Sequence, residues 1–427
     1  MDKFSSPEYK RSRKFYTIQC MVEYFVSLLV LDAFLAKLLT SIGISDSLTG
    51  IISSFVSLAF GIQIFTIFMV KIKMSRKRMV IIFDVSSMLF FMCLFLVPFL
   101  PVGKTLKTIL AMLFILLGYG CYYLILSIYY KWGNSYVEPT KRASFTANKE
   151  IISLSTGIVF TLAVGYIIDK FEGLNNLNGG FLFIACTILI LAVCNIICLL
   201  LIKKDDTSER SADNEPIKLV IKNLFSNKNY RNIIFLSVLW YFACYSSAGF
   251  MGVFKTNDLK ISVFLIQIIN IAGNIARAIC SKPIGKYSDK NTYAKGFKLG
   301  LFIIAASFFV NIFTTNSTWF LIILFTLLYN CGMAGVSANS FNMVYSYVDE
   351  KYITQAMAIK NCISGFFGFL VSIIAGKILS IVQANDNMIF GVHIYGQQLL
   401  CAISFVISII TIIYVKKVIE KQEVTIQ

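Results

Sequence analysis

The sequence predicts an all-α polytopic membrane protein whose twelve transmembrane helices form two pseudo-symmetric six-helix bundles, with both termini in the cytoplasm. Three observations predict this fold class: composition, the placement of apolar segments, and an internal repeat. The chain is 57% hydrophobic and only 14% charged, whereas a typical soluble domain is roughly 25% charged. Its apolar residues fall in long segments that reach the ~20 residues a bilayer-spanning helix needs.

Twelve apolar segments can be placed along the chain. The first begins after a basic N-terminal stretch, and we expect it to be a retained helix because it is too long for a cleaved signal and holds Glu23 and Asp32. A polar stretch near the midpoint predicts a cytoplasmic linker at 203–229 between an N-terminal half, 1–202, and a C-terminal half, 230–427. The segments are 15–40, 48–70, 79–101, 107–130, 146–168 and 181–202, then 230–254, 259–281, 297–315, 317–341, 355–382 and 395–416.

The 39 Lys and Arg residues are unevenly distributed between the loops. With the N-terminus inside, 30 of them fall in cytoplasmic segments and 5 in external loops. This asymmetry is the positive-inside signature of a multi-span protein. It accounts for the net charge of +17, so nucleic-acid binding is not expected, and the lipid bilayer is the expected surrounding.

The two halves contain a repeat. Residues 135–169 align without gaps to 346–380, and ten of the 35 aligned positions are identical, including Lys149 with Lys360 and Gly165 with Gly376. Parallel halves of six spans are a transporter architecture with the solute site between the halves near the midplane.

The spans differ in polarity. The third, sixth, ninth and twelfth are nearly pure hydrocarbon apart from isolated residues such as Asp84, Asn195 and Asn311. Polar side chains are costly in lipid, so these four spans are predicted to face lipid. The first, fourth, seventh, eighth and tenth spans contain most of the polar residues and are predicted to line a cavity.

The chain resembles the major facilitator superfamily over nearly its whole length. The most specific mark is GKYSDK at 285–290, in which Gly285, Asp289 and Lys290 are similar to the loop motif of that family. The equivalent loop of the first half keeps only the basic run 76–78. The resemblance implies that Asp289 acts as a latch, and its partners should be the start of the fifth helix or a cation there, Arg142 or Lys149. The alternative for Asp289 is an ordinary solvated loop charge.

Lys149 and Lys360 occupy equivalent places at the cytoplasmic starts of helices 5 and 11. A gating role against acidic loop groups is one interpretation. The other is a snorkelling charge that only sets topology.

Substrate-binding candidates come from four spans. Gln267, Asn270, Asn274 and Arg277 recur at steps of three, four and three residues and therefore share one helical face. Such a face hydrogen-bonds a polar solute or, alternatively, packs between helices. Tyrosines have an apolar body and a polar tip that suit sugars, nucleosides or amino acids, or they are packing residues. The further candidates are Tyr119, Tyr123, Tyr241, Tyr245 and Asn330.

Glu23 and Asp32 are the proton-coupling candidates. They are nine residues apart and point in opposite directions around one continuous helix. Asp32 is favoured slightly because it lies in the outer half, where protons would enter. The alternative for each residue is a fixed ion pair.

These features predict a secondary active transporter that moves a small polar organic solute across the inner (cytoplasmic) membrane by alternating access, by proton-coupled uptake. Efflux of a drug or metabolite is the alternative mode, and a transporter-like membrane sensor is the alternative of another class. No phosphate-binding Walker motif, nucleophile–base pair or metal-ligand cluster is present in the sequence, so we expect no enzyme activity, cofactor or metal. The expected partners are a small-molecule substrate and a co-transported proton, and the chain is expected to be monomeric.

Overall fold

The computed structural model describes residues 4, 6–69, 74–138, 142–203, 217–349, 352–389 and 391–422. Regular secondary structure among these residues is helical, apart from one short hairpin of β1 (Met388–Ile389) and antiparallel β2 (Val392–His393). Contacts divide the chain into two compact units, which are described separately. The first unit comprises Met1–Ile44, Ile62–Ser211 and Ser262–Gln267, and the second comprises Ser45–Gly61, Ala212–Ile261 and Ile268–Gln427.

Eleven helical stretches of the described chain are long and apolar enough to cross a membrane. The first predicted span is not among them, because α1 carries basic N-terminal residues and Glu23 and because its apolar part is divided between two helices. The all-α polytopic fold is confirmed, and the twelve-helix architecture fits it. The cytoplasmic position of the termini stays a prediction.

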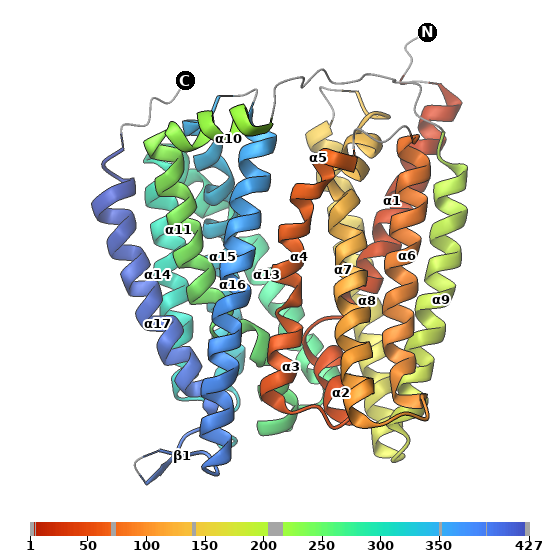
Figure 1. The fold of residues 1–427 in the computed structure, drawn as a ribbon, viewed down its shortest axis with the longest axis vertical. Coiled ribbons are helices and arrows are strands. Elements are labelled where there is room, and N and C mark those ends of the chain that lie inside the picture. Colours follow the sequence, from red (N-terminus) through yellow and green to blue (C-terminus); the bar gives the residue numbers. More distant parts are fainter. Residues whose placement is uncertain are drawn as a thin grey trace. The chain divides into compact units, whose positions relative to one another are not determined.

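The long helices α1, α6, α7, α8 and α9 form a bundle in the first unit, with shorter helices attached (Figure 1). In the bundle, α1 packs on α8 and α9, and α6 packs on α7 and α9. Ser6 caps α1 and Ser75 caps α6, each through its hydroxyl. The elements are α1 (Pro7–Leu29), α2 (Asp32–Ser41), η2 (Gln63–Phe65), α5 (Thr66–Met69), α6 (Arg76–Leu96), η3 (Val97–Phe99), α7 (Lys104–Asn134), α8 (Arg142–Gly173), α9 (Leu177–Leu201) and the first turn of α13 (Val263–Lys290).

The first predicted span is broken between α1 and α2. Asp32 has a φ of 48°, in the left-handed region that few non-glycine residues adopt. The break leaves the Val30 carbonyl without a helical partner, and the Tyr119 hydroxyl donates to it over 3.1 Å. The expectation that Glu23 and Asp32 share one continuous helix is therefore wrong, because the chain changes direction between them.

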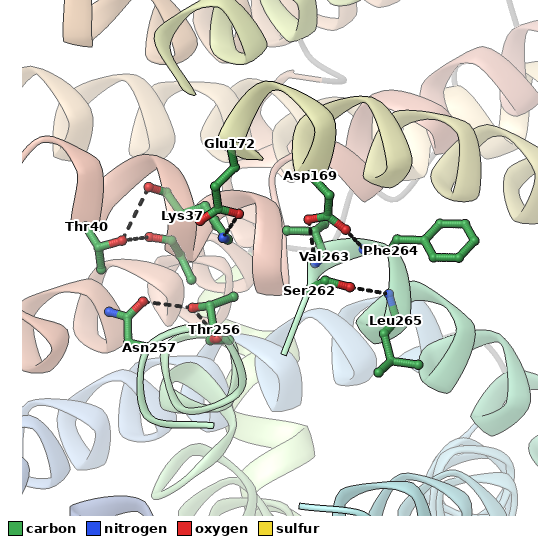
Figure 2. Close-up of polar contacts among 12 residues, drawn as sticks. Lys37, Thr40, Asp169, Glu172, Thr256, Asn257, Ser262, Val263, Phe264 and Leu265 are labelled. Atoms are coloured by element: carbon green, nitrogen blue, oxygen red, sulfur yellow. Dashed lines mark hydrogen bonds and ion pairs between the residues drawn. The ribbon is translucent and has the colours of Figure 1, made fainter. Parts of the chain in front are cut away.

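One face near the end of α8 holds two other segments of the first unit. Figure 2 shows both carboxylate oxygens of Asp169 accepting hydrogen bonds from the first two amides of α13, Val263 N at 2.9 Å and Phe264 N at 2.8 Å. One turn earlier, Gly165 leaves room for this approach, since a Cβ there would lie 3.2 Å from Phe264 Cα. One turn later, Glu172 pairs with Lys37 of α2. Residues 165, 169 and 172 share a face by helical spacing, so α8 anchors the start of α13 here.

The second unit contains the remaining helices. Of these, α14 packs on α15 and α17, and α11 packs on α16 and α17. Gly376 of α16 lies against α3, where a Cβ would be 2.6 Å from Ile51 and 3.4 Å from the Ser47 carbonyl oxygen. The elements are α3 (Asp46–Ser53), α4 (Phe55–Ile62), α10 (Ile217–Ser226), α11 (Lys228–Tyr245), η5 (Ala248–Phe250), α12 (Met251–Val253), the π-helix η6 (Phe254–Asp258), the rest of α13, α14 (Tyr293–Ile312), α15 (Leu321–Tyr347), α16 (Ile353–Ala384), β1, β2, α17 (Gly396–Tyr414) and η8 (Val415–Ile419).

Glycines bring the backbones of α14 and α15 into contact. A Cβ added to Gly300 would lie 2.7 Å from the Gly332 carbonyl oxygen and 2.9 Å from Val336 N. Small residues of this kind allow close helix association where lipid removes the hydrophobic driving force between helices.

The spans predicted to face lipid present large apolar side chains on their outer surfaces. Ile82 of α6 is 50% exposed, Ile190 of α9 is 63% exposed and Phe302 of α14 is 63% exposed. The isolated polar residues of these spans point the other way, since Asp84, Asn195 and Asn311 are all buried. Each polar group is thereby removed from the lipid side, as the cost of exposing it to hydrocarbon requires.

Candidate functional site

The first unit contains a cavity of about 310 Å³ between α1, α7 and α8. Its wall combines acids, one lysine, hydroxyl groups and aromatic rings. The spacing explains the convergence, because on each helix the lining residues recur at helical intervals that place them on one face. The lining residues are Cys20, Glu23, Tyr24 and Ser27 of α1, Tyr122, Tyr129 and Tyr130 of α7, and Lys149, Glu150, Ser153 and Leu154 of α8.

Glu23 is the acid on the α1 wall of this cavity. Its carboxylate interacts with the hydroxyls of Tyr122 and Tyr129. The Gln19 side-chain amide also points to it, with Nε2 at 3.5 Å from Oε2. Glu23 thus faces the cavity and accepts hydrogen bonds from Tyr122 and Gln19, with no ion pair to a cation among the described residues.

A buried polar network extends from Glu23 to α6 and α9. Gln19 Nε2 donates to Asp84 Oδ2 at 3.0 Å, and Asn195 Nδ2 donates to the same oxygen at 2.7 Å. Tyr129 donates its hydroxyl to Gln19 Oε1. Gln19 therefore contacts two carboxylates at once. Asp84 lies behind the cavity wall, and the sequence reasoning missed it because it considered α6 only as a lipid-facing helix.

Lys149 supplies the positive charge of the cavity. Its Nζ lies 5.1 Å from the centroid of the Tyr16 ring and 5.4 Å from that of Tyr130. An ammonium group over aromatic faces is stabilised by the ring quadrupole. A cation and an acid thus line the same small space without pairing directly.

The predicted tyrosines of α7 lie elsewhere in the first unit. Tyr119 is buried, bonds the Val30 carbonyl and packs edge-on against Phe91 at 5.1 Å. Tyr123 is also buried, with its ring centroid 6.3 Å from that of Tyr119. Neither residue lines the cavity, which instead takes the rings of Tyr122, Tyr129 and Tyr130. The seven-residue step from 122 to 129, which keeps one helical face, is the signal that could have found Tyr122 and Tyr129.

The four residues of the predicted polar stripe of α13 differ in their exposure to solvent. Gln267 is buried and Asn270 half-buried, whereas Asn274 and Arg277 are exposed. Arg277 donates to Ser337 Oγ of α15 over 3.2 Å.

The other predicted binding residues of the second unit make interhelical or local contacts. Asn330 of α15 donates to the Thr326 carbonyl at 2.9 Å and lies against Gly273 of α13. The rings of Tyr241 and Tyr245 lie next to each other at an angle of 31°, with centroids 5.3 Å apart. Roles for these residues in solute binding stay predictions.

The predicted gating residues fall at helix ends. Gly285, Asp289 and Lys290 form the last turns of α13, after Pro283. Asp289 and Lys290 are exposed, and neither side chain forms a hydrogen bond or ion pair with the described part of the chain. Lys360 is only 6% exposed and donates to Ser340 Oγ at 3.0 Å. Helix α8 begins at Arg142, whose side chain lies outside the described residues.

The family model of the Major Facilitator Superfamily matches residues 17–373, most of the chain. The chain belongs to the Major Facilitator Superfamily. The resemblance inferred from the sequence is thereby confirmed, and the protein is a transporter-type multi-pass membrane protein of this superfamily. No curated protein matches the chain.

Solved structures of superfamily members share the fold. The nucleoside transporter NupG has a TM-score of 0.70 at 15% identity, with 95% of this chain and 98% of that chain covered. The D-xylose-proton symporter has a TM-score of 0.69 at 13% identity, with 96% of this chain and 98% of that chain covered. At such identities the likeness concerns the fold.

Proposed function

We propose that this superfamily member is a secondary active transporter that takes a small polar organic solute into the cell, across the cytoplasmic membrane, together with a proton. Alternating access is the transport mechanism of this proposal. A nucleoside transporter and a D-xylose-proton symporter among the structural neighbours support this solute class and coupling to a proton.

The observation that carries the proposal is the cavity of the first unit. Its volume, about 310 Å³, lies at the small end of the range for ligand pockets, roughly 300–1,000 Å³. Its walls offer rings for an apolar surface and hydroxyl, thiol, carboxylate and ammonium groups for polar atoms. Such walls suit a polar metabolite better than a large hydrophobic drug.

Glu23 is the proton-coupling residue in this proposal. A carboxylic acid inside a membrane protein exchanges a proton when its exposure and its charged neighbours change during the cycle. Glu23 lines the cavity, shares Gln19 with Asp84 and forms no ion pair with the described cations. Asp32, which the sequence favoured slightly, does not line the cavity and is the weaker candidate.

The test is uptake by purified protein in proteoliposomes under an inside-alkaline pH gradient. Radiolabelled xylose, uridine, alanine and gluconate represent four polar solute classes. We expect one class to accumulate above its external concentration, and a protonophore to abolish that accumulation. Glu23→Gln should lose the accumulation at least tenfold but keep exchange of labelled for unlabelled solute, because only the proton step is removed.

The matched control is Asp32→Asn, which removes the other acid of the same predicted span and should leave accumulation unchanged. Accumulation in Glu23→Gln equal to that of the wild type would refute the role of Glu23. Uptake that never exceeds equilibrium, with or without the gradient, would refute proton coupling altogether.

A further inference from the structure

Two lysines occupy equivalent positions in the internal repeat. Lys149 of α8 aligns with Lys360 of α16 within the segments 135–169 and 346–380. The flanking sequences differ at most positions, but the basic residue is the same in both. Lys360 is buried and Lys149 is half-buried beside the cavity, which calls for an explanation beyond a topological charge.

Neither ammonium group forms a direct ion pair with an acid of the described residues, although Lys149 interacts electrostatically with Glu23 across the cavity. Lys149 makes its contacts with the faces of Tyr16 and Tyr130. Lys360 donates to the hydroxyl of Ser340 and is 6% exposed. Among the residues that the structure describes, the ion pairs are Lys37 with Glu172, Lys203 with Glu8 and Lys298 with Glu420, so neither lysine belongs to one.

An unpaired cation inside a membrane protein is costly, and such residues usually face a solute or ion pathway. Ring faces and one hydroxyl stabilise an ammonium group only in part, and they leave its charge available to an anion. Lys149 is the one of the two that lines the cavity of the first unit.

We propose that the transported solute is a small organic anion, and that its negative group binds the ammonium of Lys149 in the cavity of the first unit. The proposal rests on the proposed function and names its substrate class. Lys360 gives the second unit an equivalent positive group. The shared chemistry is a single anionic group, a carboxylate or a phosphate, on a hydroxylated body that the cavity tyrosines and serines contact.

The acids around the site link anion binding to a proton. Glu23 and Glu150 line the cavity with Lys149, and Asp84 lies behind Glu23. The other titratable groups at the site are the thiol of Cys20, the hydroxyls of Tyr16 and Tyr24 of α1, and three tyrosines of α7. A charged Glu23 would repel the solute, and a protonated Glu23 would not. Proton binding and anion binding therefore favour each other, as linkage requires for symport.

The experiment measures ligand-induced thermal stabilisation of the purified full chain. The probes are matched sets that differ in charge: glucose, gluconate, glucose-6-phosphate and glucosamine; uridine and uridine monophosphate; glycerol, glycerate and glycerol phosphate. We expect an anionic member of at least one set to raise the melting temperature in a saturable way, and the neutral and cationic members to have no effect. The carboxylate and phosphate arms identify the anionic group.

Variants then test Lys149 itself. Lys149→Gln should weaken anion binding about tenfold or more, as expected for loss of a charge-assisted hydrogen bond, whereas Lys149→Arg should stay within about threefold. The control is Lys377→Gln, an exposed lysine of α16 outside the cavity. Unliganded melting temperatures report whether each variant folds, and Lys149→Arg keeps the test valid if Lys149→Gln does not.

Each outcome decides the proposal. The proposal would be overturned if a neutral or cationic member stabilised the protein, or if no anion of any set did. Anion binding in Lys149→Gln as strong as in the wild type would also overturn it. Gradient-driven uptake of a neutral solute, unchanged in Lys149→Gln, would overturn it while leaving the proposed function intact. If an anion binds in a way that requires Lys149 but is not accumulated under the gradient, the result would support this proposal and contradict the proton-coupled function.

Discussion

Replacing Asp169 with alanine tests the contact between the end of α8 and the start of α13. The carboxylate is a bidentate acceptor for Val263 N at 2.9 Å and Phe264 N at 2.8 Å. The first amides of a helix have no partner inside the helix, so these two depend on Asp169.

The expected cost follows from this geometry. Hydrogen bonds to a charged group contribute about 1.5–3 kcal/mol each, and loss of a capping side chain costs about 0.5–2 kcal/mol. We take about 2 kcal/mol for the local opening of the first turn of α13, which corresponds to roughly a 30-fold change in its equilibrium constant. The rest of α13 keeps its internal hydrogen bonds and should open as before.

The assay is amide hydrogen exchange followed by mass spectrometry, with the protein in lipid nanodiscs. Peptides that cover 262–267 should exchange about 30-fold faster in Asp169→Ala, and peptides from 270–282 should not change. Asp289→Ala is the matched control, since it removes an exposed acid from the other end of the same helix. Unchanged protection of Val263 and Phe264 in Asp169→Ala would refute the assignment of Asp169 as their acceptor.

Three further predictions concern stability and are measured by thermal unfolding in the same detergent. Gly300→Ala should destabilise the protein by about 2–3 kcal/mol because the new methyl group meets the backbone of α15. The control Gly285→Ala, which has open space around it, should not destabilise the protein, and equal effects of the two changes would contradict this packing. Asn195→Leu should cost about 1–3 kcal/mol because Asp84 loses a buried donor, and a neutral effect would show that another donor replaces it. Glu172→Gln should cost less than about 1 kcal/mol, since the Glu172 side chain is 47% exposed; a larger loss would indicate a role beyond this ion pair.

The spans could be predicted from the sequence because their signal is local. Length and hydropathy decide whether a segment crosses a bilayer, and that signal survives in most predicted spans. Length and hydropathy do not reveal a backbone break inside an apolar segment, such as the break between α1 and α2. The Tyr119 hydroxyl satisfies the Val30 carbonyl there, and a residue 89 positions away is invisible to a local pattern.

The candidate site could be predicted only in part. Glu23 was predicted because a charge in an apolar span stands out, whereas Lys149 was predicted from its alignment with Lys360, and for gating rather than for the cavity. Asp84 was equally conspicuous, but the direction in which it points depends on how α6 packs against α1 and α9. Tyr119 and Tyr123 were preferred to Tyr122 for a similar reason, since the five tyrosines of α7 all lie within about 120° around the helix axis. Only tertiary contacts decide which of them line the cavity.

The two repeat-related glycines bear on how such a chain can evolve. Gly165 meets Phe264, the second residue of α13, and Gly376 meets Ser47, the second residue of α3. Each of these two glycine contacts is a helix crossing. In a two-fold homodimer of six-helix chains, both crossings would be made by the same set of residues. A chain that carries both copies can alter each crossing separately. The two crossings differ here, because Asp169, which accepts from the first amides of α13, aligns with Ser380. One crossing can therefore be strengthened without changing the other.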